Sequence, residues 1–269
     1  MRLTILLLAL LSVAQAQRFR FNQIPESVVM QREQHGPMSA RERESRIKQL
    51  FLQAGCAAAQ LNEQPLQKLA LANVICRLPG KGKETIIVGA TYSQRAPDNW
   101  SGASLLASLF QTLAKRKRRH TFVFVAFADG NNDLAGSQFF VDHMTQVDVD
   151  QTAAMVNVET LGFSPTKISS SESDKELVQD FMKVTYALKQ MASQVDVSKG
   201  VHVDSEPFAF MHIPQITIHS LTQDAVADLP SQDNDGDKFH PRFYYNSYTL
   251  VSGYLAYLDE ILKPRHRGK

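Results

Sequence analysis

The chain has little cysteine, little net charge and no long apolar run beyond its first residues. Its only two cysteines cannot form a structural zinc site without other ligands. A formal net charge of +2 over 269 residues argues against nucleic acid as a partner. No segment reaches the roughly 18–20 apolar residues that a membrane-spanning helix needs, so a membrane partner is not expected either.

The N-terminus has the pattern of an export signal. Met1 and Arg2 precede an apolar run over residues 3–13, which ends in Ala14, Gln15 and Ala16. A short basic region, an apolar core and a small-x-small site are typical of a secretory signal peptide. We therefore expect residues 1–16 to be removed and the mature chain to be soluble and secreted, either extracellular or periplasmic.

Export bears on the two cysteines, Cys56 and Cys76. An oxidising compartment makes a disulfide between them the first expectation. Two separately buried thiols are the alternative, because sequence spacing alone does not establish a bridging distance.

The remaining sequence predicts one α/β domain over residues 38–269, preceded by a polar, extended N-terminal arm over residues 17–37. Segments rich in Val, Ile and Ala, bounded by turn residues, predict strands at 69–78, 84–92, 121–128, 153–160 and 215–218. The first two are expected to be neighbours. Apolar residues at helical spacing predict helices at 40–54, 101–114, 134–144, 175–191 and 245–262. This alternation predicts a mostly parallel twisted sheet with helices on both faces.

Several polar residues follow the predicted strands. Thr91, the segment 129–133, Glu159 and His219 each stand at a strand's carboxyl end, and Asp98 follows shortly after the first of them. Ligands collect beyond the carboxyl ends of such sheets, because loops from several strands converge there on a rigid support. The basic run at 115–119 has a simpler explanation, since cations are favoured at the C-terminal end of the preceding helix.

Four sequence blocks carry a resemblance to a known family. They are Gly89-Ala90-Thr91-Tyr92, Asp98-Asn99-Trp100-Ser101-Gly102, Gly136-Ser137 and Asn157-Val158-Glu159-Thr160-Leu161-Gly162. In these blocks the chain resembles the secreted zinc aminopeptidase and glutaminyl cyclase family (metallopeptidase family twenty-eight), which also includes non-enzymatic receptor ectodomains. The resemblance implies a zinc aminopeptidase-like (phosphorylase/hydrolase-like) fold and a substrate rim that includes Glu206 and Phe208. Trp100, the only tryptophan, is expected either to join this rim as a ligand platform or to pack in the core.

The same comparison implies that most metal ligands are missing. Asp98 retains the family's bridging aspartate, and Glu159 keeps a carboxylate on a longer arm. The ligand positions that have lost their metal-binding side chain include Thr91 and Pro230. Two adjacent positions after the third predicted strand are also degenerate: they are Gly130 and Asn131 in an ungapped alignment, or Asn131 and Asn132 if one residue is deleted. Gly130 or Asn131 occupies the general-base position. Possible substitute ligands are His202, His219 and His240.

Two functional hypotheses follow from the resemblance. The first is a catalytically silent pseudopeptidase, without a cofactor, that binds a peptide or protein partner through the remnant cleft. The second is a metal-dependent aminopeptidase or glutaminyl-cyclase-like enzyme with a rearranged, single-metal zinc site. Zinc requires about three protein ligands and an open position, and a Thr hydroxyl or Asn amide binds it poorly.

Overall fold

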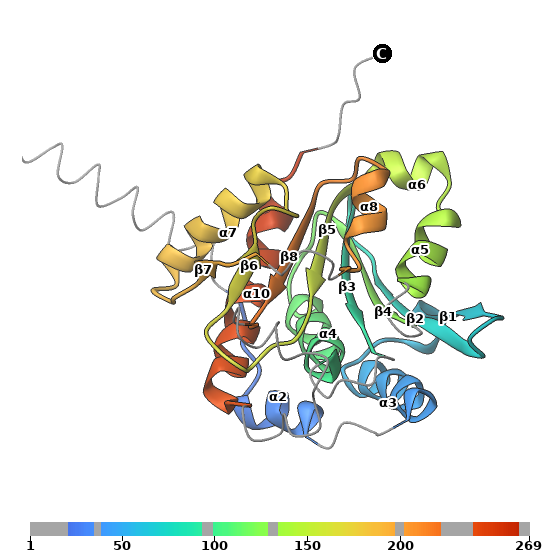
Figure 1. The fold of residues 1–269 in the computed structure, drawn as a ribbon, viewed down its shortest axis with the longest axis horizontal. Helices are drawn as coiled ribbons and strands as arrows, with labels where there is room; N and C mark the ends of the chain where they lie inside the picture. The colour runs from blue at the N-terminus through green and yellow to red at the C-terminus, as the bar shows by residue number, and fades with distance from the viewer. Residues whose placement is uncertain are drawn as a thin grey trace, which may run out of the picture.

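The computed structural model describes residues 21–34, 39–92, 99–128, 134–196, 202–221 and 239–263. Within these residues one mixed sheet of eight strands runs through the molecule in the order β1-β2-β4-β3-β5-β8-β6-β7 (Figure 1). The strands are β1 (Leu61–Leu66), β2 (Leu71–Leu78), β3 (Thr85–Thr91), β4 (Thr121–Phe127), β5 (Thr152–Val158), β6 (Lys167–Ser169), β7 (Ser193–Gln194) and β8 (Gln215–His219).

The centre of the sheet is parallel and its flanks are mixed. Strands β4, β3, β5 and β8 pair in parallel, whereas β1, β2 and β6 make antiparallel pairs. The central strands are continuous apolar runs because helices cover both of their faces. The predicted α/β class is confirmed. The prediction that the first two predicted strands are neighbours is wrong, because β4 lies between β2 and β3.

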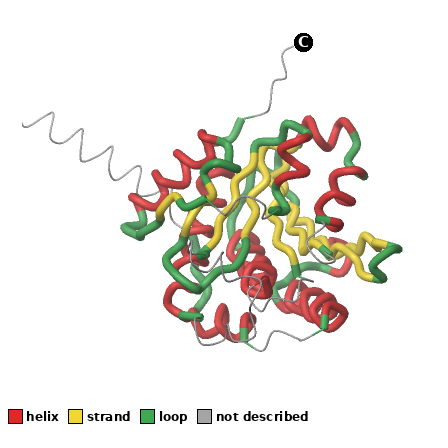
Figure 2. Tube along the Cα trace, in the orientation of Figure 1, coloured by secondary structure: helices red, strands yellow, loops and turns green. Residues whose placement is uncertain are grey.

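Helices cover both sides of the sheet (Figure 2). On one side α3 (Ala40–Gln53), α4 (Asn99–Ala114) and α10 (Pro241–Ile261) pack with α2 (Glu26–Glu33) and α7 (Lys175–Ala187). On the other side lie α5 (Ala135–Asp142), α6 (Gln146–Gln151) and α8 (Glu206–Phe210). The larger apolar core lies under the first group and a smaller one lies under the second. Within the described residues, no helix combines the length and apolar character needed to cross a bilayer.

The predicted start of helix α3 is confirmed in detail. The Ser39 hydroxyl accepts a hydrogen bond from the backbone N–H of Glu42, and the Glu42 carboxylate accepts one from the Ser39 N–H. This reciprocal pair satisfies two backbone donors at the helix start. The helix is followed by Gly55 at φ +99°, a conformation that favours glycine.

The predicted extended arm differs from the structure. Part of it, residues 26–33, forms helix α2, which packs on α4 and α10. Its hydrophobic periodicity is weak because it buries mainly Val29 and the Arg32 side chain. The Arg32 guanidinium donates to the Ser108 hydroxyl and the Gln111 side chain on α4. Side-chain hydrogen bonds therefore join this helix to the domain, and an apolar pattern does not reveal them.

The basic run after α4 ends that helix. The Arg118 guanidinium donates to the backbone carbonyls of Leu113 and Ala114 at 2.8 and 3.2 Å. Cationic donors at a helix C-terminus satisfy carbonyls that have no partner within the helix. These contacts match the structural explanation of residues 115–119.

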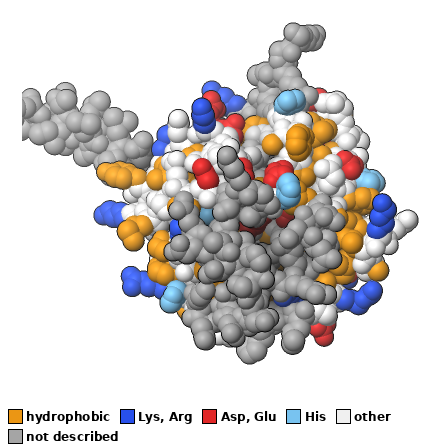
Figure 3. Space-filling model, viewed as in Figure 1, with side chains coloured by type: hydrophobic (Ala, Val, Ile, Leu, Met, Phe, Trp, Pro, Cys, Tyr) orange, Lys and Arg blue, Asp and Glu red, His pale blue; other side chains and the backbone are white. Residues whose placement is uncertain are grey.

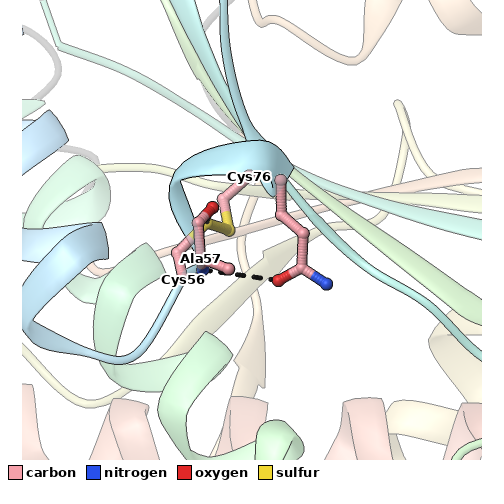
Figure 4. Close-up of a disulfide and its surroundings, with 4 residues drawn as sticks. Cys56, Ala57 and Cys76 are labelled. Carbon is pink, nitrogen blue, oxygen red and sulfur yellow. Dashed lines mark hydrogen bonds between the residues drawn. A yellow bond between two sulfur atoms is a disulfide. The ribbon is translucent and has the colours of Figure 1, made fainter.

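Cys56 and Cys76 form a disulfide with a Cα–Cα distance of 6.4 Å (Figure 4). The bond joins the turn after α3 to strand β2, so it ties the first long helix to the sheet. Next to it, the Ala57 N–H donates to the Gln60 side chain. The disulfide expected between these two cysteines is therefore confirmed.

Candidate site at the carboxyl ends of the strands

The residues that carry the family resemblance are mostly buried and structural. Ala90, Tyr92, Ser101 and Ser137 are almost fully inaccessible to solvent. The Tyr92 hydroxyl donates to the Ala72 carbonyl, and the Ser101 hydroxyl accepts from the Leu161 N–H at 2.7 Å. Ser101 lies within α4, which begins at Asn99 and thus before the predicted start at residue 101. The Ser101 hydroxyl joins α4 to the segment that follows β5.

Two glycines in the resembling blocks allow close backbone contacts. A Cβ atom added at Gly102 would lie 2.3 Å from the Val158 carbonyl oxygen, and one at Gly136 would lie 2.4 Å from the Ala128 carbonyl oxygen. Such distances exclude a side chain unless the backbone shifts. The start of α4 can therefore approach the end of β5, and the start of α5 can approach the end of β4. This close approach is a physical reason for glycine at both positions of the resembling blocks.

A buried amide holds the end of β4 in place. Asn73 is fully buried, its Oδ1 accepts from the Ala128 N–H, and its Nδ2 donates to the Gly136 carbonyl. Sequence reasoning missed this role, because a single Asn within a strand gives no sign of partners about sixty residues away. The residue fixes one wall of the candidate site.

Thr91 is the first degenerate ligand position, and the structure describes it fully. It ends β3, is 4% exposed, and its hydroxyl donates to the Phe127 carbonyl at 3.5 Å. The hydroxyl thus faces the neighbouring strand as an uncharged group. Asp98, Gly130, Asn131, Asn132 and Pro230 lie outside the described residues.

Glu159 lies just beyond β5 with a partly exposed side chain. Its Oε1 accepts from the Asn157 Nδ2 at 2.6 Å and from the Asp204 N–H at 3.3 Å. Asn157 is fully buried on β5, so a buried amide and a loop N–H fix one carboxylate oxygen. Sequence reasoning missed the role of Asn157 as the partner of Glu159. The available signal was the two-residue spacing, because residues two apart along a strand face the same side of the sheet.

His219 does not have a nitrogen available for a metal. It ends β8 at 1% exposure, its Nε2 donates to the Val195 carbonyl at 2.9 Å, and its Nδ1 accepts from the Leu221 N–H at 3.1 Å. Burial lowers its pKa to about 4, and the nearby Lys167 charge also lowers it. The imidazole is therefore neutral at pH 7, with both nitrogens used to join β8 to adjacent loops.

The other two histidines proposed as substitute ligands lie on the surface. His202 is exposed and its Nδ1 pairs with the Glu206 carboxylate at 3.0 Å, which raises the pKa of the imidazole. His240 precedes α10 and its ring packs edge-on against Phe243. These contacts hold His202 at Glu206 and His240 at Phe243, and neither of them involves Glu159.

Two of the three predicted rim residues are core residues instead. Trp100 is 2% exposed, and its indole N–H donates to the Glu33 carbonyl at 2.8 Å, so it anchors α2 to α4. Phe208 is fully buried against Phe127 and Phe140. Trp100 on α4 belongs to the larger apolar core and Phe208 on α8 to the smaller one. Glu206 alone remains partly exposed.

The donor set does not suit the zinc pair that the resemblance implies. Within the described residues, no group of three His, Cys, Asp or Glu side chains is placed to hold a metal ion. Thr91 offers a neutral hydroxyl that already donates to a carbonyl, and the imidazole nitrogens of His219 are both engaged. Neither residue meets the requirement of zinc for an available imidazole, thiolate or carboxylate.

Comparisons with known proteins establish the fold. No family model matches the chain, and no curated protein sequence matches it. Among solved structures it is similar to the aminopeptidase LapA of Legionella pneumophila, with a TM-score of 0.70 and 16% identity over 88% of this chain and 71% of that one. It is also similar to a glutaminyl cyclase from an Acidobacteriales bacterium, with a TM-score of 0.68 and 15% identity over 87% of this chain and 93% of that one.

A third similar structure is the zinc aminopeptidase BSAP of Bacillus subtilis, with a TM-score of 0.60 and 17% identity over 69% of this chain. This chain spans about half of that enzyme's length, at 49%. At such identities the likeness concerns the fold. The chain thus has the fold of zinc aminopeptidases and glutaminyl cyclases, and the expected fold is confirmed.

Proposed function

We propose that this chain is a secreted aminopeptidase-fold protein that lacks peptidase chemistry and binds a peptide or protein partner through the remnant cleft. The state of Thr91 carries this proposal. A buried hydroxyl that donates to the Phe127 carbonyl stands where the resemblance calls for an imidazole ligand. His219, the imidazole at the end of β8, two strands from β3, cannot replace it while both of its nitrogens are hydrogen-bonded.

The loss of chemistry follows from the residue types. A metal-bridging water and a carboxylate base act together in the family mechanism that the resemblance implies. General-base catalysis alone contributes about 10² to 10⁴ in rate, and neither Gly130 nor Asn131 can accept a proton in that role. A zinc site with too few charged ligands would also lack the means to activate water.

Binding requires less than catalysis, and Glu159 still supports it. One of its carboxylate oxygens is held by Asn157 and the Asp204 N–H, so the group has a fixed orientation. A fixed, partly exposed carboxylate favours a cationic group such as the N-terminal ammonium of a peptide. The natural partner class is accordingly a peptide end, or a protein segment that presents one.

The test measures metal content and turnover on the same preparation. After incubation with zinc and dialysis, we expect sub-stoichiometric zinc and no hydrolysis of aminoacyl chromogenic substrates with zinc, manganese or cobalt. Metal-dependent turnover that disappears in Asp98→Ala would overturn the proposal and support the rearranged metal site.

The binding part is tested with peptides that differ only at the amine. A free-amine peptide should bind more tightly than its N-acetylated form, and Glu159→Gln should remove most of that difference. Glu63→Gln, a carboxylate on β1, is the matched control. Equal binding of the two peptides to the unmodified protein would contradict a role for Glu159 in binding a peptide end.

Secretion is tested separately by expressing the full chain in a host with an export pathway. The protein in the external or periplasmic fraction should begin at Gln17. A cytoplasmic protein that keeps residue 1 would contradict this part of the proposal.

A further inference from the structure

A concave surface lies at the end of strand β8 opposite His219. It is a cleft of about 520 Å³ between α8, the loop before α7 and the first residue of β8. Its lining includes Glu172, Asp174, Glu206, Phe210, His212 and Gln215. Gln215 begins β8 whereas His219 ends it, so this part of the cleft lies at the opposite end of the strand from His219. Glu206, the predicted rim residue that remains partly exposed, lines the cleft as well. Figure 3 shows acidic and hydrophobic side chains gathered around the position of α8 on this face.

The cleft concentrates negative charge. Glu172 and Glu206 interact electrostatically, and the pKa of Glu172 is raised, first by burial and then by the charge of Glu206. Its described lining residues include three carboxylates and no lysine or arginine. The Glu206 carboxylate already pairs with the exposed His202 imidazole at 3.0 Å, so a ligand cation would compete with that imidazole for Glu206. Asp174 uses part of its charge to cap α7, through hydrogen bonds from two backbone N–H groups. Like charges held together in this way are stabilised by a cation that comes between them.

A buried polar atom at the same place also needs a donor. Gln215 is 8% exposed, and its Nε2 donates to the Glu172 carbonyl. Its Oε1 has no hydrogen-bond partner within the described residues. A buried acceptor without a donor costs free energy, and a ligand N–H that reaches it would recover part of that cost.

An exposed aromatic ring completes the surface. Phe210 is 80% exposed at the end of α8, although other phenylalanines near it, such as Phe208, are buried. An exposed ring beside carboxylates suits a ligand that combines a cation with an apolar stem. Lysine and arginine have this composition, and cations also interact favourably with aromatic faces.

We propose that this cleft binds a lysine or arginine side chain of an extended partner peptide, with its cation between Glu172 and Glu206 and its aliphatic stem against Phe210. The ligand class is a basic peptide segment. The proposal goes beyond the function proposed above, because it uses neither the free amine of a peptide nor Glu159.

The experiment uses the mature chain and a fluorescent peptide of sequence Gly-Lys-Arg-Lys-Gly, blocked at both ends so that it carries no terminal charge. Fluorescence anisotropy should detect binding that weakens as salt increases. The same peptide with glutamine at its three basic positions should bind at least about tenfold more weakly.

Variants then locate the site. Glu172→Gln with Glu206→Gln should weaken binding about tenfold, whereas Glu63→Gln with Asp150→Asn, an equal charge change elsewhere, should change it less than about twofold. Phe210→Ala should weaken binding about threefold. Val147→Ala, at an exposed apolar position of α6, is its matched control. Phe210 is exposed, so its variant keeps the fold even if the double variant does not.

Two results would overturn the proposal. One is equal affinity of the basic and glutamine peptides, which would show that charge does not select the ligand. The other is an equal loss of affinity in the cleft variant and its charge-matched control, which would show that only the overall charge of the protein matters.

Discussion

Each end of the sheet buries a histidine, and the two are held differently. At the amino ends, His120 precedes β4 and contacts Asp259 of α10, whose carboxylate accepts from the backbone N–H groups of Arg119 and His120 at 3.0 and 2.8 Å. At the carboxyl ends, His219 is bonded, among the residues that the structure describes, to backbone groups of adjacent loops, namely those of Val195 and Leu221.

The two histidines show that a buried side chain at a strand end can be structural at either end of the sheet. A carboxylate at the amino ends joins the last helix to the start of β4. At the carboxyl ends, where the fold can place catalytic groups, the histidine is neutral and serves as a loop connector. A histidine at a strand end indicates a ligand only when one of its nitrogens remains available.

The largest expected effect is at the amino ends. Asp259→Ala removes a buried carboxylate and leaves the buried His120 N–H and the partly buried Arg119 N–H without this acceptor, so unfolding free energy should fall by about 3–5 kcal/mol. Chemical denaturation measures the change. Glu260→Ala, at the more exposed neighbouring carboxylate, should cost no more than about 1 kcal/mol. Similar losses for the two variants would contradict an anchoring role for Asp259.

The next effect is a pH dependence at the carboxyl ends. The pKa of His219 is about 4 in the folded chain and about 6.5 when unfolded. The unfolded chain therefore takes up a proton first, so this contribution is complete above pH 6.5 and falls by up to about 3 kcal/mol as pH falls to 4.

The variant His219→Gln does not titrate in this range. Its unfolding free energy, measured from pH 7 to pH 4, should therefore lack this part of the decline. The difference between the two proteins isolates His219 from other titrating groups, such as Glu33, whose pKa is raised to about 7 by the partial burial of its carboxyl group. Parallel pH curves for the two proteins would show that the imidazole is not buried and neutral.

A smaller effect separates a core tryptophan from a ligand platform. Trp100→Phe keeps an aromatic ring but loses the hydrogen bond to the Glu33 carbonyl, so stability should fall by about 1–2 kcal/mol. Tyr186→Phe, at an 88% exposed ring, is the control and should change little. A loss of peptide binding without a loss of stability would show that Trp100 contacts the ligand, as a residue of the substrate rim would.

The smallest effect concerns the residual carboxylate. Glu159→Gln keeps an oxygen that can accept from Asn157, so unfolding free energy should change by about 1 kcal/mol or less. Thermal denaturation measures the change. A much larger loss would mean that Glu159 is primarily structural, as Asp259 is.

Much of the fold could be predicted because its signals are local. The Ser39 and Glu42 capping box, the apolar runs of β3 and β4 and the helix end near Arg118 each depend on neighbouring residues. The strand order could not be read in this way, because the insertion of β4 between β2 and β3 is set by packing between distant segments. The helix over residues 26–33 was missed because Arg32 joins it to the domain through polar contacts.

The candidate site was less predictable than the fold, because its side-chain contacts join segments that are distant in the sequence. The resemblance identified Thr91 and Glu159 by position, but the partners of Glu159 come from β5 and from a loop about 45 residues later. Trp100 and Phe208 were placed on the rim because their blocks lie near the site, while their ring direction depends on how α4 and α8 pack. Side-chain direction is a tertiary property that sequence spacing does not give.

Zinc stoichiometry tests the central claim most directly. The mature chain, saturated with zinc and then dialysed, should retain much less than one zinc per chain by elemental analysis, and the same amount in Asp98→Ala and Glu159→Gln. Two tightly held zinc ions per chain, lost in both variants, would contradict the claim that this fold is no longer a metallopeptidase.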